Sequence, residues 1–308
     1  MLTDLHVHLR PDERPSEPAQ YFTAANAERY REAATARGVT ELGVSEHIHR
    51  FAQALEVWDH PFWRYSAVDD LDAYCAWVRG DTDLRLGIEA DFVPGREDRL
   101  AELLAARDWD HVIGSVHFLR DRGVDAEYSE TGTNWDVWQG VTRPEEVWER
   151  YFLTLAEAAR SGLYDILAHP DLVKVWGPNR PLPERDLRFF YEPAVEAIAE
   201  TGITVEVSTA GLRKPVGELY PARAFLEMVA DAGNPVALSS DAHKPEHLGY
   251  GYAEALELLH DVGITELATF ERRRRTLVAI EDADRDHAHR HGNTPPPAIG
   301  ADGRPASL

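Results

Sequence analysis

The chain has 308 residues, and 44% of them are hydrophobic, which is enough to build a full core. Over most of its length the chain lacks the composition of a disordered protein. Its formal net charge of −22 disfavours nucleic-acid binding, because phosphate backbones attract positively charged surfaces. There is no apolar run of membrane-spanning length, no signal-peptide pattern and only one cysteine, Cys75, so the sequence predicts a soluble cytoplasmic protein.

Strand-like and helix-like patterns alternate along the chain. Short apolar runs predict strands at Leu2–His8, Glu41–Ser45, Leu84–Glu89, His111–Val116, Tyr164–Ala168, Thr204–Val207 and Val236–Ser239. Helix-period stretches lie between them, at Ala25–Arg37, Leu71–Val78, Asp98–Arg107, Glu145–Arg160, Leu187–Glu200 and Ala222–Asp231. This alternation predicts a parallel sheet with right-handed crossovers. A weaker run, Thr265–Phe270, is a candidate eighth strand.

Side chains that commonly bind metals stand at the ends of most of these runs. They are His6, His8, His47, Glu89, His117, His169, Asp241 and His243. An open sheet gathers ligands at one switch point, whereas a barrel brings the carboxyl ends of all its strands to one opening. The distribution therefore predicts an α/β fold, a distorted (β/α)7 barrel of the TIM type, with a metal site at the C-terminal ends of the strands.

The number of candidate ligands predicts more than one metal ion. One zinc or iron ion binds about four to six ligands, so two or three divalent cations are expected. Histidine and carboxylate ligands accept zinc, iron and manganese alike, and the sequence does not choose between them. The other histidines, His49 among them, are expected to be structural or exposed.

Two long connections and a tail complete the chain. Residues Ile48–Val68 and Phe118–Val141 leave from the ligand end of the predicted barrel, so we expect them to form pocket walls or a lid. The barrel domain is expected to span residues 1–281. The charged and proline-containing segment 282–308 is predicted to be disordered.

The ligand motifs, taken in order, resemble those of the polymerase-and-histidinol-phosphatase (PHP) metallophosphoesterases. The motifs are Asp4-Leu5-His6-Val7-His8, Ser45-Glu46-His47, Gly87-Ile88-Glu89, Gly114-Ser115-Val116-His117, Ala168-His169-Pro170 and Ser240-Asp241-Ala242-His243. The resemblance runs from Met1 to about Ile280. Within the family, segments 168–174 and 208–221 resemble the histidinol-phosphate phosphatase branch.

The resemblance implies a trinuclear centre with a set of ligands for each ion. The first ion would bind His6, His8, Glu89 and Asp241, the second Glu89, His117 and His169, and the third His47 and His243. The third ion also takes a residue shortly after the first strand, which is histidine in many members of the family. Residues 9–14 contain no histidine, so we expect an acid, Asp12 before Glu13.

The implied activity is hydrolysis of a phosphomonoester, L-histidinol phosphate, by in-line attack of a metal-bridging hydroxide, as a step of histidine biosynthesis. Arg213, Lys174 and Asp241 are expected to serve catalysis. The small-molecule substrate is expected to contact Arg213, Lys174 and His117. The positively charged side chains of Arg213 and Lys174 would neutralise phosphoryl oxygens. Charge alone suggests that the substrate amine is received by acids of the Phe118–Val141 segment, namely Asp121, Asp125, Glu127, Glu130 and Asp136.

Three alternatives are weighed against this interpretation. A small nucleotide such as a nucleoside 3′,5′-bisphosphate is the other substrate that the same family would allow. An amidohydrolase barrel also begins with an H-x-H motif, but it usually carries a modified lysine on a middle strand, where this chain has Glu89 and His117. A partner module without catalysis would lack ligands, and here nearly all are present.

Overall fold

The computed structural model describes residues 1–13, 15–126, 135–281 and 288–289. Seven parallel strands form one sheet in the order β1-β2-β3-β4-β7-β8-β9. Their bounds are β1 Leu2–Asp4, β2 Val39–His47, β3 Arg85–Asp91, β4 His111–Ser115, β7 Ile166–Leu167, β8 Thr204–Ser208 and β9 Val236–Ser239. The edges meet in a parallel bridge between Val7 and Ala242, where the His8 N–H donates to the Ala242 carbonyl at 2.8 Å. The predicted (β/α)7 barrel is confirmed.

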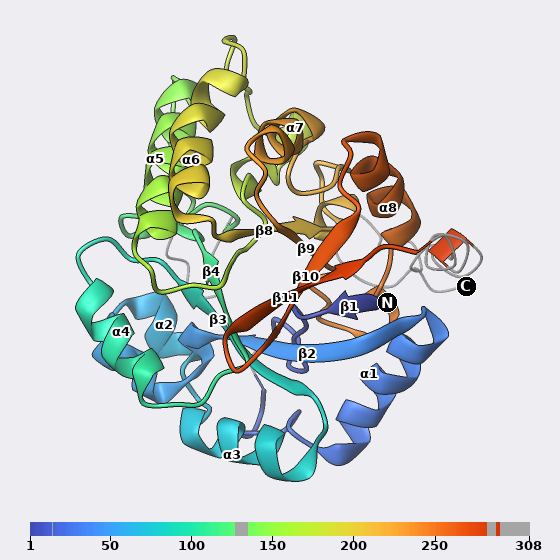
Figure 1. The fold of residues 1–308 in the computed structure, drawn as a ribbon. Coiled ribbons are helices and arrows are strands. Elements are labelled where there is room, and N and C mark those ends of the chain that lie inside the picture. The colour runs from blue at the N-terminus through green and yellow to red at the C-terminus, as the bar shows by residue number, and fades with distance from the viewer. Residues whose placement is uncertain (14, 127–134, 282–287, 290–308) are drawn as a thin grey trace, which may run out of the picture.

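The helices form an outer layer around the barrel (Figure 1). They are α1 Ala24–Ala36, α2 Pro61–Ser66, α3 Leu71–Asp81, α4 Glu97–Ala105, α5 Pro144–Arg160, α6 Arg188–Thr201, α7 Arg223–Asp231 and α8 Tyr252–Asp261. Two of them, α2 and α8, were not among the predicted helices. Helix α2 begins at Pro61, and the ring of His60 caps it by accepting a hydrogen bond from the Phe62 N–H at 3.2 Å. Within the described residues, none of the helices is both long and apolar enough to cross a bilayer.

The candidate eighth strand is not part of the barrel. The run predicted at Thr265–Phe270 forms β10 (Glu266–Glu271), which pairs antiparallel with β11 (Arg274–Ala279) in a separate two-stranded sheet. Arg272 and Arg273 turn this hairpin with φ angles of 48° and 60°. Such turns usually contain Gly or Asn, so two arginines gave no sequence signal for a hairpin.

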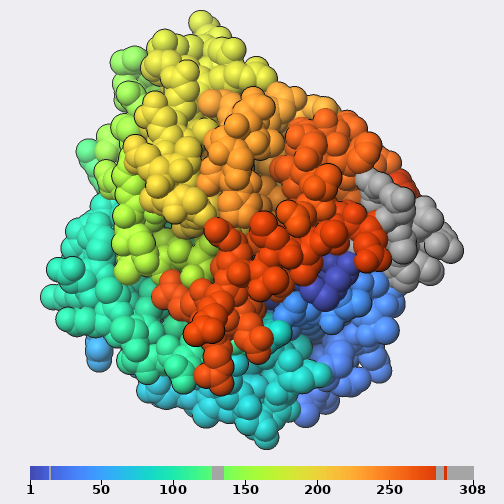
Figure 2. Space-filling model, in the orientation of Figure 1, coloured from blue at the N-terminus to red at the C-terminus, as the bar shows by residue number. Residues whose placement is uncertain are grey.

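The β10–β11 hairpin covers the N-terminal end of the barrel. It crosses the barrel in Figure 1 and lies over the middle of the same face in Figure 2. Arg273 donates to the Leu163 carbonyl at 2.7 Å, and Arg275 donates to the Gly202 carbonyl at 2.7 Å, both of which precede barrel strands. Two apolar side chains of the hairpin, Ala268 and Phe270, form a buried cluster with side chains of the barrel, namely Leu5, Ile113, Ile166, Ala168 and Ala237. One end of the barrel is thereby sealed, which leaves the C-terminal end for chemistry.

The long connections lie at that C-terminal end, as expected. The first contains α2 and two short 3-10 helices, Ile48–Arg50 and Ala52–Glu56. The second begins with a small hairpin of β5 (Phe118–Leu119) and β6 (Arg122–Gly123), and residues 127–134 lie outside the described residues. The predicted disordered tail, 282–308, also lies outside them except for residues 288–289, so the boundary at 281 stays a prediction.

A buried histidine inside the barrel makes stability depend on pH. The Nε2 atom of His111 lies 2.8 Å from the Leu5 carbonyl and 2.8 Å from the Ser45 hydroxyl, and burial lowers the pKa of this ring from 6.5 to about 4. Between these two values the unfolded chain binds a proton that the folded ring rejects. We therefore expect His111 to contribute to a loss of unfolding free energy, at most about 3 kcal/mol, as pH falls from 6.5 to 4.

The measurement is urea unfolding at several pH values between 4 and 7. His111→Gln should flatten the decline relative to the parent chain, whereas His260→Gln, at an exposed position on α8, should leave the slope as it is. Parallel curves for the parent and the His111 variant would contradict this source of acid sensitivity.

Candidate metal centre

The structure brings all eight predicted strand-end ligands together. His6 and His8 follow β1, His47 ends β2, and Glu89 lies within β3. His117 follows β4, His169 follows β7, and Asp241 and His243 follow β9. Because parallel strands share one direction around the barrel, these positions meet at its C-terminal opening.

Glu89 is the central side chain of this group. It is 1% exposed, and both of its carboxylate oxygens face imidazoles. The Oε2 atom contacts His47 and lies 3.4 Å from His6 Nε2 and 3.5 Å from His8 Nε2. The Oε1 atom lies 3.3 Å from His117 Nε2 and 3.1 Å from His169 Nε2. A carboxylate in this position could bridge two cations.

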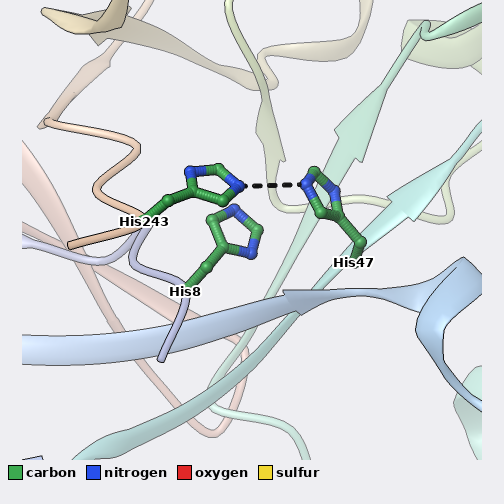
Figure 3. Close-up of side chains that lie close together, drawn as sticks. All are labelled: His8, His47 and His243. Carbon is green, nitrogen blue, oxygen red and sulfur yellow. Dashed lines mark hydrogen bonds between the residues drawn. The ribbon is translucent and has the colours of Figure 1, made fainter. Parts of the chain in front are cut away.

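Three histidines form a second group beside Glu89. His8 packs between His47 and His243, with ring centroids 4.2 Å and 4.1 Å away, and the Nε2 atoms of His47 and His243 are 3.3 Å apart (Figure 3). Ligand atoms of these three residues lie within 4.8 Å of one another. The same distance limit holds for His6, His8 and Asp241, and for His47, Glu89 and His117. The geometry offers three overlapping places for a cation.

Buried polar atoms without partners test whether cations fit this centre. His6 Nε2, His8 Nε2, Glu89 Oε2 and Asp241 Oδ1 are buried, and none of them makes a hydrogen bond to the described part of the chain. They face one another, since Asp241 Oδ1 lies 3.3 Å from His8 Nε2 and 3.7 Å from His6 Nε2. Buried polar atoms are nearly always paired, so four unpaired atoms that converge on one point fit a divalent cation.

The electrostatics keep the two acids ionised. Burial alone would raise the pKa of Glu89, but the imidazoles of His47 and His117 hold it well below its usual range. Burial likewise opposes ionisation of Asp241, and His6 and His8 hold the pKa of that carboxyl well below its usual range. Metal ligands must be deprotonated, so both acids can bind a cation at neutral pH.

Comparison with known proteins identifies the family. A sequence model of the PHP domain matches residues 20–210, a range that contains His47, Glu89, His117 and His169. This chain belongs to the PHP domain family. It is 34% identical over 285 residues to a probable histidinol-phosphatase of Deinococcus radiodurans, an alignment that covers 89% of this chain and 98% of the relative. It is 28% identical to the histidinol-phosphatase of Bacillus subtilis, over 58% of this chain and 70% of that one.

Solved structures share the PHP fold. A histidinol phosphate phosphatase from Lactococcus lactis, complexed with zinc, L-histidinol and phosphate, superposes with a TM-score of 0.64 at 19% identity, over 90% of this chain and 100% of that one. A putative histidinol phosphatase from Listeria monocytogenes gives 0.63 at 17% identity, over 82% and 98% of the two chains. At these identities the likeness shows the barrel architecture.

Asp12 lies beside the histidine group of this PHP protein, where an acid was expected in place of a histidine. Its Oδ1 atom is 3.1 Å from His243 Nε2 and 3.2 Å from the guanidinium of Arg50. The side chain of Asp12 is largely exposed, and the charge of His243 with a hydrogen bond from that ring holds the pKa of this carboxyl well below its usual range. Glu13 makes no such contact within the described residues, so the geometry favours Asp12, whose role as a ligand stays a prediction.

Buried acids hold several of the PHP histidines in place. Glu206 on β8 accepts a hydrogen bond from His6 Nδ1 at 2.7 Å and from the His169 N–H at 2.6 Å. This contact turns His6 Nε2 toward the centre, as metal-binding histidines require. Asp91 contacts His117 Nδ1 at 2.8 Å in the same way.

The sequence analysis did not assign these supporting acids. An acid inside an otherwise apolar strand, as in Thr204–Ser208, is the signal that could have found Glu206.

A cavity of about 400 Å³ adjoins the PHP centre at the barrel opening. It is lined by the candidate ligands Asp12, His47, His117, His169, Asp241 and His243, by the cations Arg10, Arg50 and Lys214, and by apolar walls that include Phe62, Phe118, Leu172 and Val175. Arg10 and Arg50 are buried and paired with Asp69 and Glu46, both at 2.7 Å. Lys214 is exposed and, in the part of the chain that the structure describes, its ammonium has no ion-pair partner.

Two predicted substrate contacts do not line this cavity. Lys174 is buried, and its Nζ lies 3.0 Å from Asp171 and 3.1 Å from Glu218. Arg213 donates to the carbonyls of Ser240 and Asp241. Arg213 therefore holds the turn that carries Asp241, and Lys174 closes a buried ion pair beside the cavity. Their contact with substrate stays a prediction that this arrangement does not favour.

His49, which was expected to be structural or exposed, lines the cavity. Its ring stacks on His47 with centroids 4.8 Å apart, and its Nδ1 lies 3.5 Å from Asp91. Sequence reasoning missed this position because His49 follows the end of β2 in a 3-10 turn, where strand alternation no longer predicts side-chain direction.

Proposed function

We propose that this PHP protein is a metal-dependent phosphomonoesterase that hydrolyses L-histidinol phosphate to L-histidinol and phosphate. One observation carries the proposal: ionised acids and unpaired imidazole nitrogens converge at the barrel opening, beside a cavity that also exposes Lys214. The name of the Deinococcus relative, which aligns over nearly the whole chain, supports histidinol phosphate as the substrate and histidine biosynthesis as the pathway.

We propose the ligand sets that the resemblance to the PHP family implies. One ion would be held by His6, His8, Glu89 and Asp241, and a second by Glu89, His117 and His169. A third would be held by His47 and His243 with Asp12. Zinc is supported by the ligand types and by the zinc in the Lactococcus structure, although iron and manganese bind the same donors. We infer two to three ions.

The cations and the side chains of the protein would divide the chemistry between them. Divalent ions bound here would lower the pKa of a water molecule and neutralise phosphoryl charge. Glu206 and Asp91 keep the rings of His6 and His117 aimed at the centre. Lys214 can approach a phosphoryl oxygen from the cavity wall, where a flexible ammonium serves as a point charge. The single cysteine favours a reducing compartment, and we place the protein in the cytoplasm.

The test is phosphate release from L-histidinol phosphate and from a nucleoside 3′,5′-bisphosphate at equal concentration. The purified chain is supplied with Zn²⁺, Mn²⁺ or Fe²⁺, and a chelator-treated sample serves as the control. We expect a strong preference for histidinol phosphate and loss of activity after chelation. A preference for the bisphosphate would move the protein to another branch of the family, and activity that survives complete metal removal would exclude the mechanism.

A further inference from the structure

The cavity beside the metal centre has a lining of mixed character. Candidate metal ligands and Lys214 line it together with the apolar side chains Phe62, Phe118, Leu172 and Val175. A single further acid, Asp125, also lines it. Asp125 is exposed to the cavity, and within the described residues its carboxylate has no hydrogen-bond or ion-pair partner. An unpaired acid near an apolar wall is suited to a cationic group of a ligand.

The backbone that precedes Asp125 makes two hydrogen bonds through Val124. The Val124 N–H donates to the His117 carbonyl at 2.8 Å, and the Val124 carbonyl accepts from the Trp176 indole at 3.0 Å. The preceding hairpin pairs Gly123 with Phe118. These contacts tie the backbone before Asp125 to the segment that carries His117, so Asp125 lies at the end of the barrel where the candidate ligands meet.

The charge of Asp125 affects the pKa of another side chain that lines the cavity, Tyr220. Tyr220 lines the same cavity, and its pKa is raised well above the usual range by burial and then by the carboxylates of Asp171 and Asp125. The other acids that charge alone suggested are placed differently. Asp121 lines a separate cleft near Arg96 and Arg150.

The remaining acids of that segment are engaged or not described. Asp136 accepts a hydrogen bond from Arg180 at 2.8 Å. Glu127 and Glu130 lie outside the described residues. Among the described acids of this segment, Asp125 alone lines the cavity.

We infer that Asp125 receives the protonated amine of the substrate alcohol, and that this contact makes the enzyme prefer phosphomonoesters whose alcohol carries an ammonium group. The inference rests on the proposed function. A phosphoryl group held at the metal centre would place its alcohol in this cavity, where an ammonium group could meet the carboxylate of Asp125. A charge-assisted contact of this kind changes affinity by about tenfold to a hundredfold.

The experiment compares two substrates on three forms of the metal-loaded full chain. L-Histidinol phosphate carries the amine, and 4-nitrophenyl phosphate lacks a cationic group. Asp125→Asn removes the charge and keeps the shape, and Asp121→Asn is the matched control, an acid of the same segment in the other cleft. For Asp125→Asn we expect KM for histidinol phosphate to rise about tenfold or more beyond any rise for 4-nitrophenyl phosphate.

The outcomes separate this inference from the proposed function. If the parent chain does not hydrolyse histidinol phosphate, the proposed function fails. If it does, but Asp125→Asn affects both substrates equally or neither, Asp125 does not bind the amine. Asp125→Glu, which restores the charge, should recover part of the preference, whereas a purely structural role would leave it as impaired as the Asn variant. An effect of Asp121→Asn equal to that of Asp125→Asn would point to the general charge of the loop and would overturn the assignment.

Discussion

Replacing Glu89 with glutamine is expected to lower kcat by about a thousandfold or more and to remove metal from the protein. Glu89 is buried, and its two oxygens face five imidazoles, so an amide would present an N–H₂ group where a cation should bind. The loss of a bridging carboxylate would weaken two of the proposed sites together. A thousandfold loss corresponds to about 4 kcal/mol of transition-state stabilisation.

The measurement pairs steady-state phosphate release with metal content by mass spectrometry. Glu102→Gln, at an exposed position on α4, is the control and should keep both values. Circular dichroism should show that the Glu89 variant remains folded, because the imidazoles can still hydrogen bond to the amide. A Glu89 variant with full metal content and nearly full activity would remove this residue from the centre.

The fold and the convergence of the candidate ligands could be predicted from the sequence for one physical reason. Parallel strands end on the same side of a barrel, so a residue at the end of an apolar run is placed before any loop is known. His47, Glu89 and His117 illustrate this, because each lies at or beside the C-terminal end of its strand. The same reasoning fails where the chain has left the strand, as at Lys174, because the course of a loop depends on contacts far apart in sequence.

The supporting acids could not be predicted for the same reason, because their contacts join residues that are far apart in the sequence. Glu206 lies on a strand that was predicted, but its partners His6 and His169 follow β1 and β7 and lie 200 and 37 positions away in the sequence. Only closure of the barrel brings them within reach. The β10–β11 hairpin was missed for a local reason, since its turn uses two arginines with positive φ in place of the residues that usually signal such a turn.

Replacing Lys174 with methionine is expected to lower the free energy of unfolding by about 3–5 kcal/mol. The ammonium lies 3.0 Å from Asp171, whose side chain is fully buried, and donates to the Leu219 carbonyl at 2.8 Å. Burial raises the pKa of Asp171, and the charge of Lys174 opposes that rise. Without the lysine, a buried carboxylate loses its cation and must be protonated or hydrated, either of which destabilises the fold.

Urea unfolding of the Lys174 variant, beside Lys214→Met, distinguishes a structural lysine from a substrate-binding one. Lys214 is exposed on the cavity wall, so its loss should raise KM for histidinol phosphate while changing stability by less than about 0.5 kcal/mol. Lys174→Met should do the opposite, and the double variant Lys174→Met with Asp171→Asn should recover part of the lost stability, because no charge is then left unpaired. If Lys174→Met instead raised KM without destabilising the protein, Lys174 would contact the phosphoryl group, as its sequence motif predicts, and the buried ion pair would contribute little to stability.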